Sequence, residues 1–216
     1  GFSTAIYVLP SLRTLASSLL AGAGILAVAV GFASQHALSN IISGLFLVLF
    51  KPFKINDRIS YQDKSGVVED ITLRHVVVRD FNNRRIIIPN AIISDEVITN
   101  SDFRDERLCR WIEIGISYES DIEKARAIMK EEMTNHPFFI DHRTEEEIME
   151  GVELAPVRVI GLGDFSVNLR GWAWAKDISD AFVMSCDLLE SIKKRFDNEG
   201  INIPYPHRTI VYKAQS

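Results

Sequence analysis

Charged side chains are missing from one long stretch of the chain. Residues 14–50 contain no Asp, Glu, Lys or Arg, and Arg13 and Lys51 flank the stretch on either side. A membrane-spanning helix needs roughly 20 apolar residues, so this stretch is too long for one straight crossing. Its first half is rich in Gly and Ala, whereas its second half is bulky. The pattern predicts a membrane-spanning helix that breaks near Gln35 and His36 and continues as a second helix along the membrane face.

The small residues of the first half form two stripes on a helical wheel drawn at about 100° per residue. One stripe contains Gly24, Ala27, Gly31 and Ser34, and the other contains Gly22, Ala29 and Ala33. Small residues allow helices to approach closely in lipid, so two stripes indicate two identical neighbours and therefore a ring. The alternative is an ordinary helix of a monomeric bundle, because small residues are common in membrane helices.

A row of mostly larger side chains lies between the two stripes and would face the axis of such a ring. The row consists of Ala21, Ile25, Val28, Phe32 and Gln35. An apolar constriction can gate a pore by dewetting. We therefore predict that Val28 and Phe32 form the constriction.

The segments on either side of the apolar stretch suggest its orientation. Lys51, Lys54 and Arg58 follow it directly, so the positive-inside rule predicts that the C-terminal part lies in the cytoplasm. Residues 2–9 are interpreted either as the tail of a preceding membrane helix or as a disordered start. Residues 10–13 would then form a turn.

The pattern after the apolar stretch is one of short strands rich in Val and Ile. Strands are expected at residues 55–61, 66–73, 76–81 and 85–88. Asn82 and Asn83 predict a hairpin turn between the last two, since Asn tolerates a positive φ. Strands of this length and spacing favour a small barrel of about five strands, which we assign to residues 53–104.

Residues 105–206 follow the pattern strand–helix–strand–strand–helix, which is most of a ferredoxin-like unit. Strands are expected at 107–118, 156–162 and 165–175, and helices from Ser120 or Asp121 to about Asn135 and over 179–199. The last helix is expected to turn Phe182, Cys186, Leu189, Ile192 and Phe196 inward. A final short strand is expected at 209–212, within a C-terminal segment 207–216.

Composition excludes several classes of protein. A formal net charge of −5 over 216 residues argues against binding to nucleic acid, for which a basic patch is the usual footprint. Cys109 and Cys186 lack the spacing of metal ligands, so we expect reduced, buried thiols, no metal and no other cofactor. No nucleophile, base and orienting group come together, so we expect that the protein is not an enzyme.

Several short motifs resemble those of the small-conductance mechanosensitive channel (MscS) family. They lie at residues 31–40 (GFASQHALSN), 43–44 (SG), 51–53 (KPF), 88–90 (IPN), 118–122 (YESDI) and 203–206 (IPYP). They occur in the order of the family and cover nearly the whole chain from about residue 20 onward. No single motif is specific, but the combination is.

The resemblance implies a mechanosensitive ion channel, opened by membrane tension to release ions and small osmolytes during hypoosmotic shock. It implies a homoheptamer and a multi-pass protein of the cell inner membrane, with membrane lipids as its other partners. The implied fold is a kinked pore-lining helix and interfacial helix at residues 14–52, after the end of a preceding membrane helix at 1–13. A cytoplasmic β barrel-like (Sm-like) domain, an α+β ferredoxin-like vestibule domain and a C-terminal strand of an oligomeric β-barrel would follow.

The resemblance also assigns roles to individual residues. The pore-constricting positions of the family fall on Val28 and Phe32, and its kink falls on Gln35 and His36. Asn40 begins the interfacial half, which would rest against the β domain near Asn90. The tight-packing positions of the family fall on Gly24, Ala27, Ala29 and Gly31.

Two departures from the family pattern matter. Phe32 and Val28 both replace Leu, so we expect the narrowest ring at Phe32. His36 replaces a Gly, so it is either a pH sensor, because His titrates near neutral pH, or a polar residue at a wet helix junction. A second hypothesis for the whole protein is a non-conducting, membrane-anchored oligomeric scaffold or signalling module.

Overall fold

The computed structural model describes residues 10–208 and 210. The chain divides into two compact units, Gly1–Phe103 and Arg104–Ser216. The expected apolar segment at residues 2–9 lies outside the described residues, as do Thr209, Val211 and Tyr212 of the expected C-terminal strand. Both expectations therefore stay predictions.

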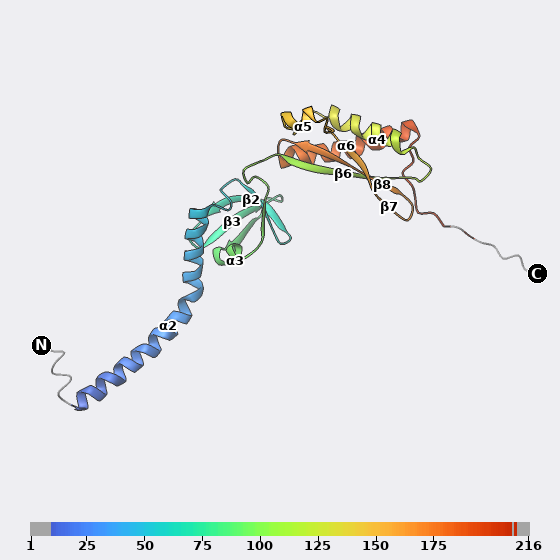
Figure 1. Ribbon diagram of the computed structural model, residues 1–216. Coiled ribbons are helices and arrows are strands. Elements are labelled where there is room, and N and C mark those ends of the chain that lie inside the picture. The colour runs from blue at the N-terminus through green and yellow to red at the C-terminus, as the bar shows by residue number, and fades with distance from the viewer. Residues whose placement is uncertain (1–9, 209, 211–216) are drawn as a thin grey trace, which may run out of the picture. The chain divides into compact units, whose positions relative to one another are not determined.

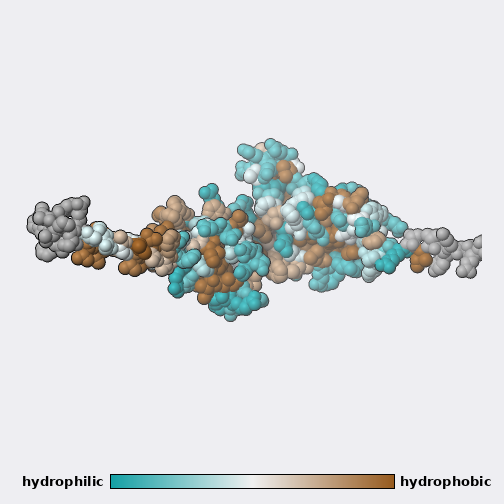
Figure 2. Space-filling view, turned by 90° about the horizontal axis from the view of Figure 1, so that it is seen from below, coloured by the Kyte–Doolittle hydropathy of each residue, from teal (hydrophilic) through white to brown (hydrophobic). Residues whose placement is uncertain are grey.

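The first unit begins with one long helix, α2 (Pro10–Phe50), which is uninterrupted over 41 residues (Figure 1). The expected turn at residues 10–13 is therefore wrong: Pro10 starts the helix, where its missing N–H costs nothing. The expected break into two helices is also not found, because the helix continues through Gln35 and His36, neither of which is a helix breaker. Figure 1 shows a change in direction along α2 instead, and Figure 2 shows hydrophobic residues along its surface.

A five-stranded antiparallel sheet follows α2. Its elements are β1 (Arg58–Tyr61), β2 (Lys64–Ile71), β3 (His75–Asp80), β4 (Arg85–Pro89), the short helix α3 (Asn90–Asp95) and β5 (Ile98–Asn100). The strand order is β4-β3-β2-β1-β5, and each neighbouring pair is antiparallel. The four predicted strands are confirmed with shifted ends, whereas α3 and β5 are too short to show a periodic pattern in the sequence.

The predicted hairpin between β3 and β4 is confirmed, and Asp80 organises it. Its carboxylate accepts hydrogen bonds from the backbone N–H groups of Asn82 (2.9 Å) and Arg84 (2.8 Å). Asn83 has a φ of 63°, which Asn tolerates. The N–H of Arg84, then its guanidinium and last the N–H of Asn82 lower the pKa of Asp80 below its ordinary value, against the opposing effect of burial.

The core of the first unit takes side chains from the helix as well as from the sheet. Leu47 from α2 and Phe53 from the following loop are buried against the sheet residues Val68 and Val76 and against Ile93 of α3. The last turns of α2 are therefore part of the β domain.

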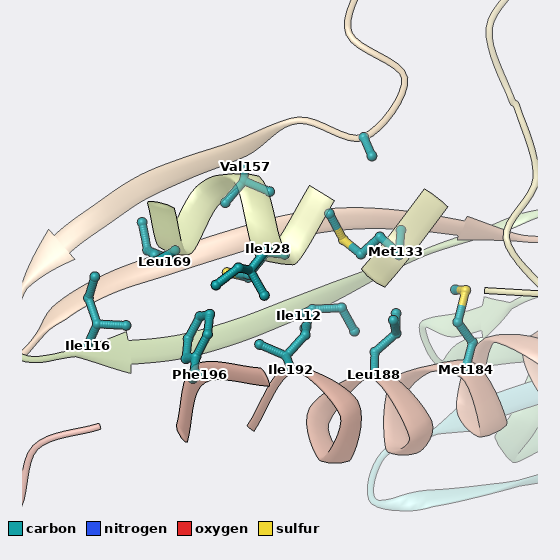
Figure 3. Close-up of a cluster of buried hydrophobic side chains, with 14 of the residues drawn as sticks. Ile112, Ile116, Ile128, Met133, Val157, Leu169, Met184, Leu188, Ile192 and Phe196 are labelled. Carbon is teal, nitrogen blue, oxygen red and sulfur yellow. The ribbon is translucent and has the colours of Figure 1, made fainter. Parts of the chain in front are cut away.

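The second unit is a three-stranded antiparallel sheet with helices against it. Its elements are β6 (Leu108–Ile116), α4 (Ile122–Asn135), α5 (Glu145–Met149), β7 (Val157–Leu162), β8 (Val167–Ala175) and α6 (Ile178–Glu199). The strand order is β6-β8-β7. Figure 3 shows side chains of α4, α6 and the sheet meeting in one hydrophobic core. The predicted strand–helix–strand–strand–helix order is confirmed.

Local capping explains where these helices begin and end. Asp121 accepts hydrogen bonds from the N–H groups of Glu123 and Lys124 at the start of α4. Thr144 forms a capping box with Glu147 at the start of α5. Gly200, with a φ of 76°, ends α6.

The prediction for α6 was partly wrong in its choice of face. Ile192 and Phe196 are buried, but Phe182 is 63% exposed and Leu189 is 46% exposed. Cys186 is also exposed, while Cys109 is half-buried. The face toward the sheet instead carries Ala181, Met184, Ser185 and Leu188. Hydrophobic residues occur in two adjacent rows of this helix, and the row with small Ala181 and Ser185 allows the closer approach.

Candidate functional site

Most of α2 has no packing partner among the residues that the structure describes. The segment Thr14–Phe50 is long and apolar enough to cross a membrane, and none of its most hydrophobic window is buried. Val28 is 58% exposed and Phe32 is 70% exposed. A continuous apolar surface of this extent marks a site of contact with lipid or protein.

The small residues in the first half of α2 are not required by contacts with the rest of the described residues. A Cβ added at Gly22, Gly24 or Gly31 would meet nothing within 4 Å. Ala27, Ala29 and Ala33 are exposed. Their small size is therefore available for packing against another molecule, which is the use that Gly and Ala have in membrane helices.

The two predicted constriction residues lie at one end of an open groove within the first unit. The groove has a volume of about 1170 Å³ and runs along α2 to the end of α3. Phe32, Ile42 and Phe46 of α2 line it together with Ile93, and Gln35 adds a polar group. Val28, Gly31, Phe32 and Gln35 all line this groove.

The C-terminal part of α2 is fixed to the β domain through Asn40 and Asn90. The Asn90 side-chain amide donates to the backbone oxygens of Asn40 (3.3 Å) and Thr72 (3.0 Å). In return, the Asn40 side-chain oxygen accepts from the N–H of Ala91 at 3.0 Å. Asn90 is fully buried, so these bonds are shielded from competing water. The structure thus brings together the two residues that were expected to meet.

Gly44 makes this close approach of helix and β domain possible. A Cβ at this position would lie 2.4 Å from Asn90 Nδ2 and 2.7 Å from the backbone oxygen of Leu73. The sequence singled out Gly44 only as part of a motif and assigned it no role. Gly is required at position 44 because of Asn90, which is far away along the chain.

The two residues of the expected kink have different surroundings. Gln35 faces the groove described above, whereas the side chain of His36 is exposed. The backbone oxygen of His36 accepts a hydrogen bond from Asn40 Nδ2 at 2.8 Å. Asn40 thus binds both the preceding turn of its own helix and the β domain.

Comparison with known proteins agrees with these features. Family models match in two places: "Mechanosensitive ion channel, beta-domain" over residues 36–102 and "Mechanosensitive ion channel MscS, C-terminal" over residues 112–203. An uncharacterized MscS family protein of Archaeoglobus fulgidus is 34% identical over 95% of this chain and 68% of its own length. The large-conductance mechanosensitive channel MscMJLR of Methanocaldococcus jannaschii is 31% identical over 96% of this chain.

The chain spans only part of several relatives. It covers 65% of a Synechocystis MscS family protein and 56% of MscMJLR. Among solved structures, Helicobacter pylori MscS in its closed state has a TM-score of 0.83 and 26% identity, covering 99% of this chain and 80% of that chain. Arabidopsis thaliana MSL1, with a TM-score of 0.68 and 19% identity over 88% of this chain and 66% of that chain, shares the fold.

Proposed function

The chain belongs to the MscS family of mechanosensitive ion channels, and we propose that it opens under membrane tension and releases ions and small osmolytes during hypoosmotic shock. The predicted family is thereby confirmed. Membership identifies a membrane-embedded, homo-oligomeric ion channel and not an enzyme, as expected from the sequence. The observation that carries the proposal is the unpartnered apolar helix α2, joined at its C-terminal end to a folded β domain.

The proposed assembly is a homoheptamer in the cell inner membrane, with lipids around it and a multi-pass membrane part. The two stripes of small residues support a ring, because each copy needs a different surface for each neighbour. Gly24 and Gly31 would pack against one neighbour, and Gly22 and Ala29 against the other. The number seven comes from the family resemblance.

The proposed gate closes the pore by excluding water from it. Val28 and Phe32 of each copy would face the axis and keep a narrow apolar neck free of water. Tension favours the conformation with the larger area in the membrane plane, so it shifts the population toward the open state. The helices would then tilt along their Gly and Ala stripes until the neck fills with water. Phe32, as the larger side chain, would form the narrowest ring.

The proposed role of Asn40 and Asn90 is to couple this movement to the β domain. Their hydrogen bonds hold the C-terminal part of α2, so bending would occur before them, near Gln35 and His36. Because α2 is continuous, such bending is a change of curvature and requires no break. His36 has two proposed roles, a pH sensor or a polar residue at the water boundary, and comparing activation thresholds of His36→Gly at two pH values distinguishes them.

Patch-clamp recording of the purified protein in liposomes, with suction ramps, tests the channel. We expect stepwise currents at a reproducible tension, and Phe32→Ser should lower that tension or cause leak. Val30→Ser is the matched control, because Val30 is also exposed (62%) but lies on the opposite side of α2 from the axial row. Equal effects of both substitutions would contradict a pore-facing Phe32.

The wild-type oligomer is first shown to be folded. If it then passes no current at any tension up to membrane rupture, the result would favour the scaffold hypothesis. No feature of the described residues favours that hypothesis over the channel.

A further inference from the structure

The sheet of the second unit has one face that lies away from the core shared with α4 and α6. Trp172 and Trp174 lie on this face, because they alternate along β8 with small residues that are buried in the core. Both Trp side chains are half-buried. Trp side chains in such positions, with one part covered and one part exposed, are typical of surfaces that bind another molecule.

An open pocket with a volume of about 370 Å³ lies on this face, within the second unit. Its lining consists of Cys109, His142, Val152, Glu153, Pro156, Arg158, Trp172 and Trp174. The His142 ring is stacked on Trp174, with 4.3 Å between ring centroids and 14° between ring planes. Burial lowers the pKa of His142 below its ordinary value, so the ring is neutral at pH 7. It therefore extends the aromatic surface of the pocket without adding charge.

The walls of the pocket are fixed by hydrogen bonds. The N–H of Trp172 donates to the backbone oxygen of Pro156 at 3.2 Å. The guanidinium of Arg143 donates to the backbone oxygen of Val152 at 2.8 Å, which holds the segment between α4 and β7 in place. A pocket whose walls are already ordered loses little entropy when a ligand enters.

The charges beside the pocket favour an anionic ligand. Glu153 contacts two cations: its Oε1 accepts from Lys130 Nζ at 2.6 Å, and its Oε2 lies 2.5 Å from a terminal nitrogen of Arg158. Lys130 first and Arg158 second lower the pKa of Glu153, so the carboxylate is ionised at pH 7. One carboxylate between two cations leaves one positive charge uncompensated. Arg158 lines the pocket and its side chain is 54% exposed, so a ligand can reach this charge.

Arg158 also has the geometry to bind a carboxylate. A guanidinium has five N–H donors, and the contacts of Arg158 with the Val157 oxygen and with Glu153 use two of them. Its planar group can form paired, charge-assisted hydrogen bonds with a carboxylate. The two Trp rings in turn favour a flat ligand, because stacked aromatic rings gain energy beyond the area that they bury.

We propose that this pocket binds a small aromatic carboxylate, whose ring packs on Trp172 and Trp174 and whose carboxylate pairs with Arg158. The site lies in the C-terminal domain and is separate from the proposed gate on α2. The inference does not depend on the channel function, because binding can be measured without opening the channel.

The test uses benzoate as the probe and the purified oligomer in detergent at pH 7.5, with binding measured by saturation-transfer NMR. Benzamide, which has nearly the same shape but no charge, is the matched ligand. Arg158→Gln removes the positive charge, and Trp172→Leu removes one aromatic ring. Trp111→Leu is the matched control, because Trp111 is opposite Trp172 on the neighbouring strand β6 but does not line the pocket. Thermal unfolding of each variant confirms that it is folded.

The proposal predicts that the wild type binds benzoate about tenfold more tightly than benzamide, since only benzoate forms charge-assisted hydrogen bonds. Arg158→Gln should remove this preference and leave the benzamide affinity unchanged. Trp172→Leu should weaken the binding of both ligands, and Trp111→Leu of neither.

Three results overturn the proposal. The first is the absence of saturable benzoate binding to the wild type, which is also expected if a second copy covers the pocket in the oligomer. The second is an equal benzoate affinity for Arg158→Gln and the wild type. The third is a loss of binding in Trp111→Leu as large as that in Trp172→Leu, which would place the ligand elsewhere on the sheet.

Discussion

Gly44 and Asn90 are in such close contact that a Cβ on residue 44 would lie 2.4 Å from the Asn90 amide nitrogen. The contact places a helix backbone directly against a buried side chain that also binds Asn40 and Thr72. The attachment of the helix to the β domain therefore depends on the absence of one methyl group.

Gly44→Ala should displace α2 from the β domain. The neighbouring Leu73 oxygen, at 2.7 Å from the added Cβ, is backbone and cannot move aside easily. Overpacking of this kind costs about 1–3 kcal/mol. Thermal unfolding of the purified oligomer measures the loss, with Ser43→Ala as control, since residue 43 is only half-buried. Equal melting temperatures for the two variants would contradict the close packing.

Asn40→Ala and Asn90→Ala should show strongly coupled effects. Asn40→Ala removes the bond from the Ala91 N–H, whereas Asn90→Ala removes the bonds to the backbone oxygens of Asn40 and Thr72. Both weaken the same attachment of α2 to the β domain, and each leaves buried polar groups unsatisfied at a cost of about 1–3 kcal/mol. The double variant should therefore lose clearly less stability than the sum of the two single variants. A double-mutant cycle by thermal or denaturant unfolding measures the coupling. Additive losses would show that the residues act separately.

Gly24→Leu should impair assembly without disturbing the fold of the single chain. A Cβ added at Gly24 meets none of the described residues within 4 Å, but a larger side chain there would fill the stripe proposed to contact a neighbour. Light scattering of the detergent-solubilised protein should report a smaller oligomer. Val30→Leu, on the opposite side of the helix from the axial row, should assemble normally. An intact oligomer for Gly24→Leu would argue against the stripe as an interface.

The β3–β4 hairpin should lose stability in acid because of Asp80. The N–H groups around this carboxylate, with Arg84, lower its pKa in the folded protein below the ordinary value of 3.8. A group with a lowered folded pKa stabilises the protein above its ordinary pKa, and that stabilisation disappears as the pH falls through the folded pKa. Asp80→Asn should therefore melt at a lower temperature than the wild type at neutral pH. In acid, the difference between the two melting temperatures should become smaller. A constant difference at every pH would contradict this.

The sequence predicted the elements whose patterns are local. In β3, Val76 and Val78 are buried, as β alternation requires, and in α4 the spacing of Ala125, Ile128 and Met129 identifies the buried face. The helix α3 and strand β5 were missed because six and three residues are too few to show a period.

Features that depend on distant residues could not be predicted in this way. The buried face of α6 was assigned partly wrongly, because Phe182 and Leu189 are as hydrophobic as the row that packs on the sheet. The Asn40–Asn90 contact was expected from family motifs, whereas the hydrogen bond from the Asn100 amide to the backbone oxygen of Pro52 was not expected at all. A polar side chain that binds a loop 48 residues away leaves no pattern in its local sequence.

The burial of Leu47 and Phe53 in the core of the β domain has a consequence for biosynthesis. The β domain cannot complete its core until the last turn of α2 has left the membrane, since that turn supplies one of the core side chains. Insertion of the helix one residue too deep would move Leu47 by about 1.5 Å along the helix axis and draw it away from its place in the core. The folded β domain therefore limits how far the helix can enter the bilayer.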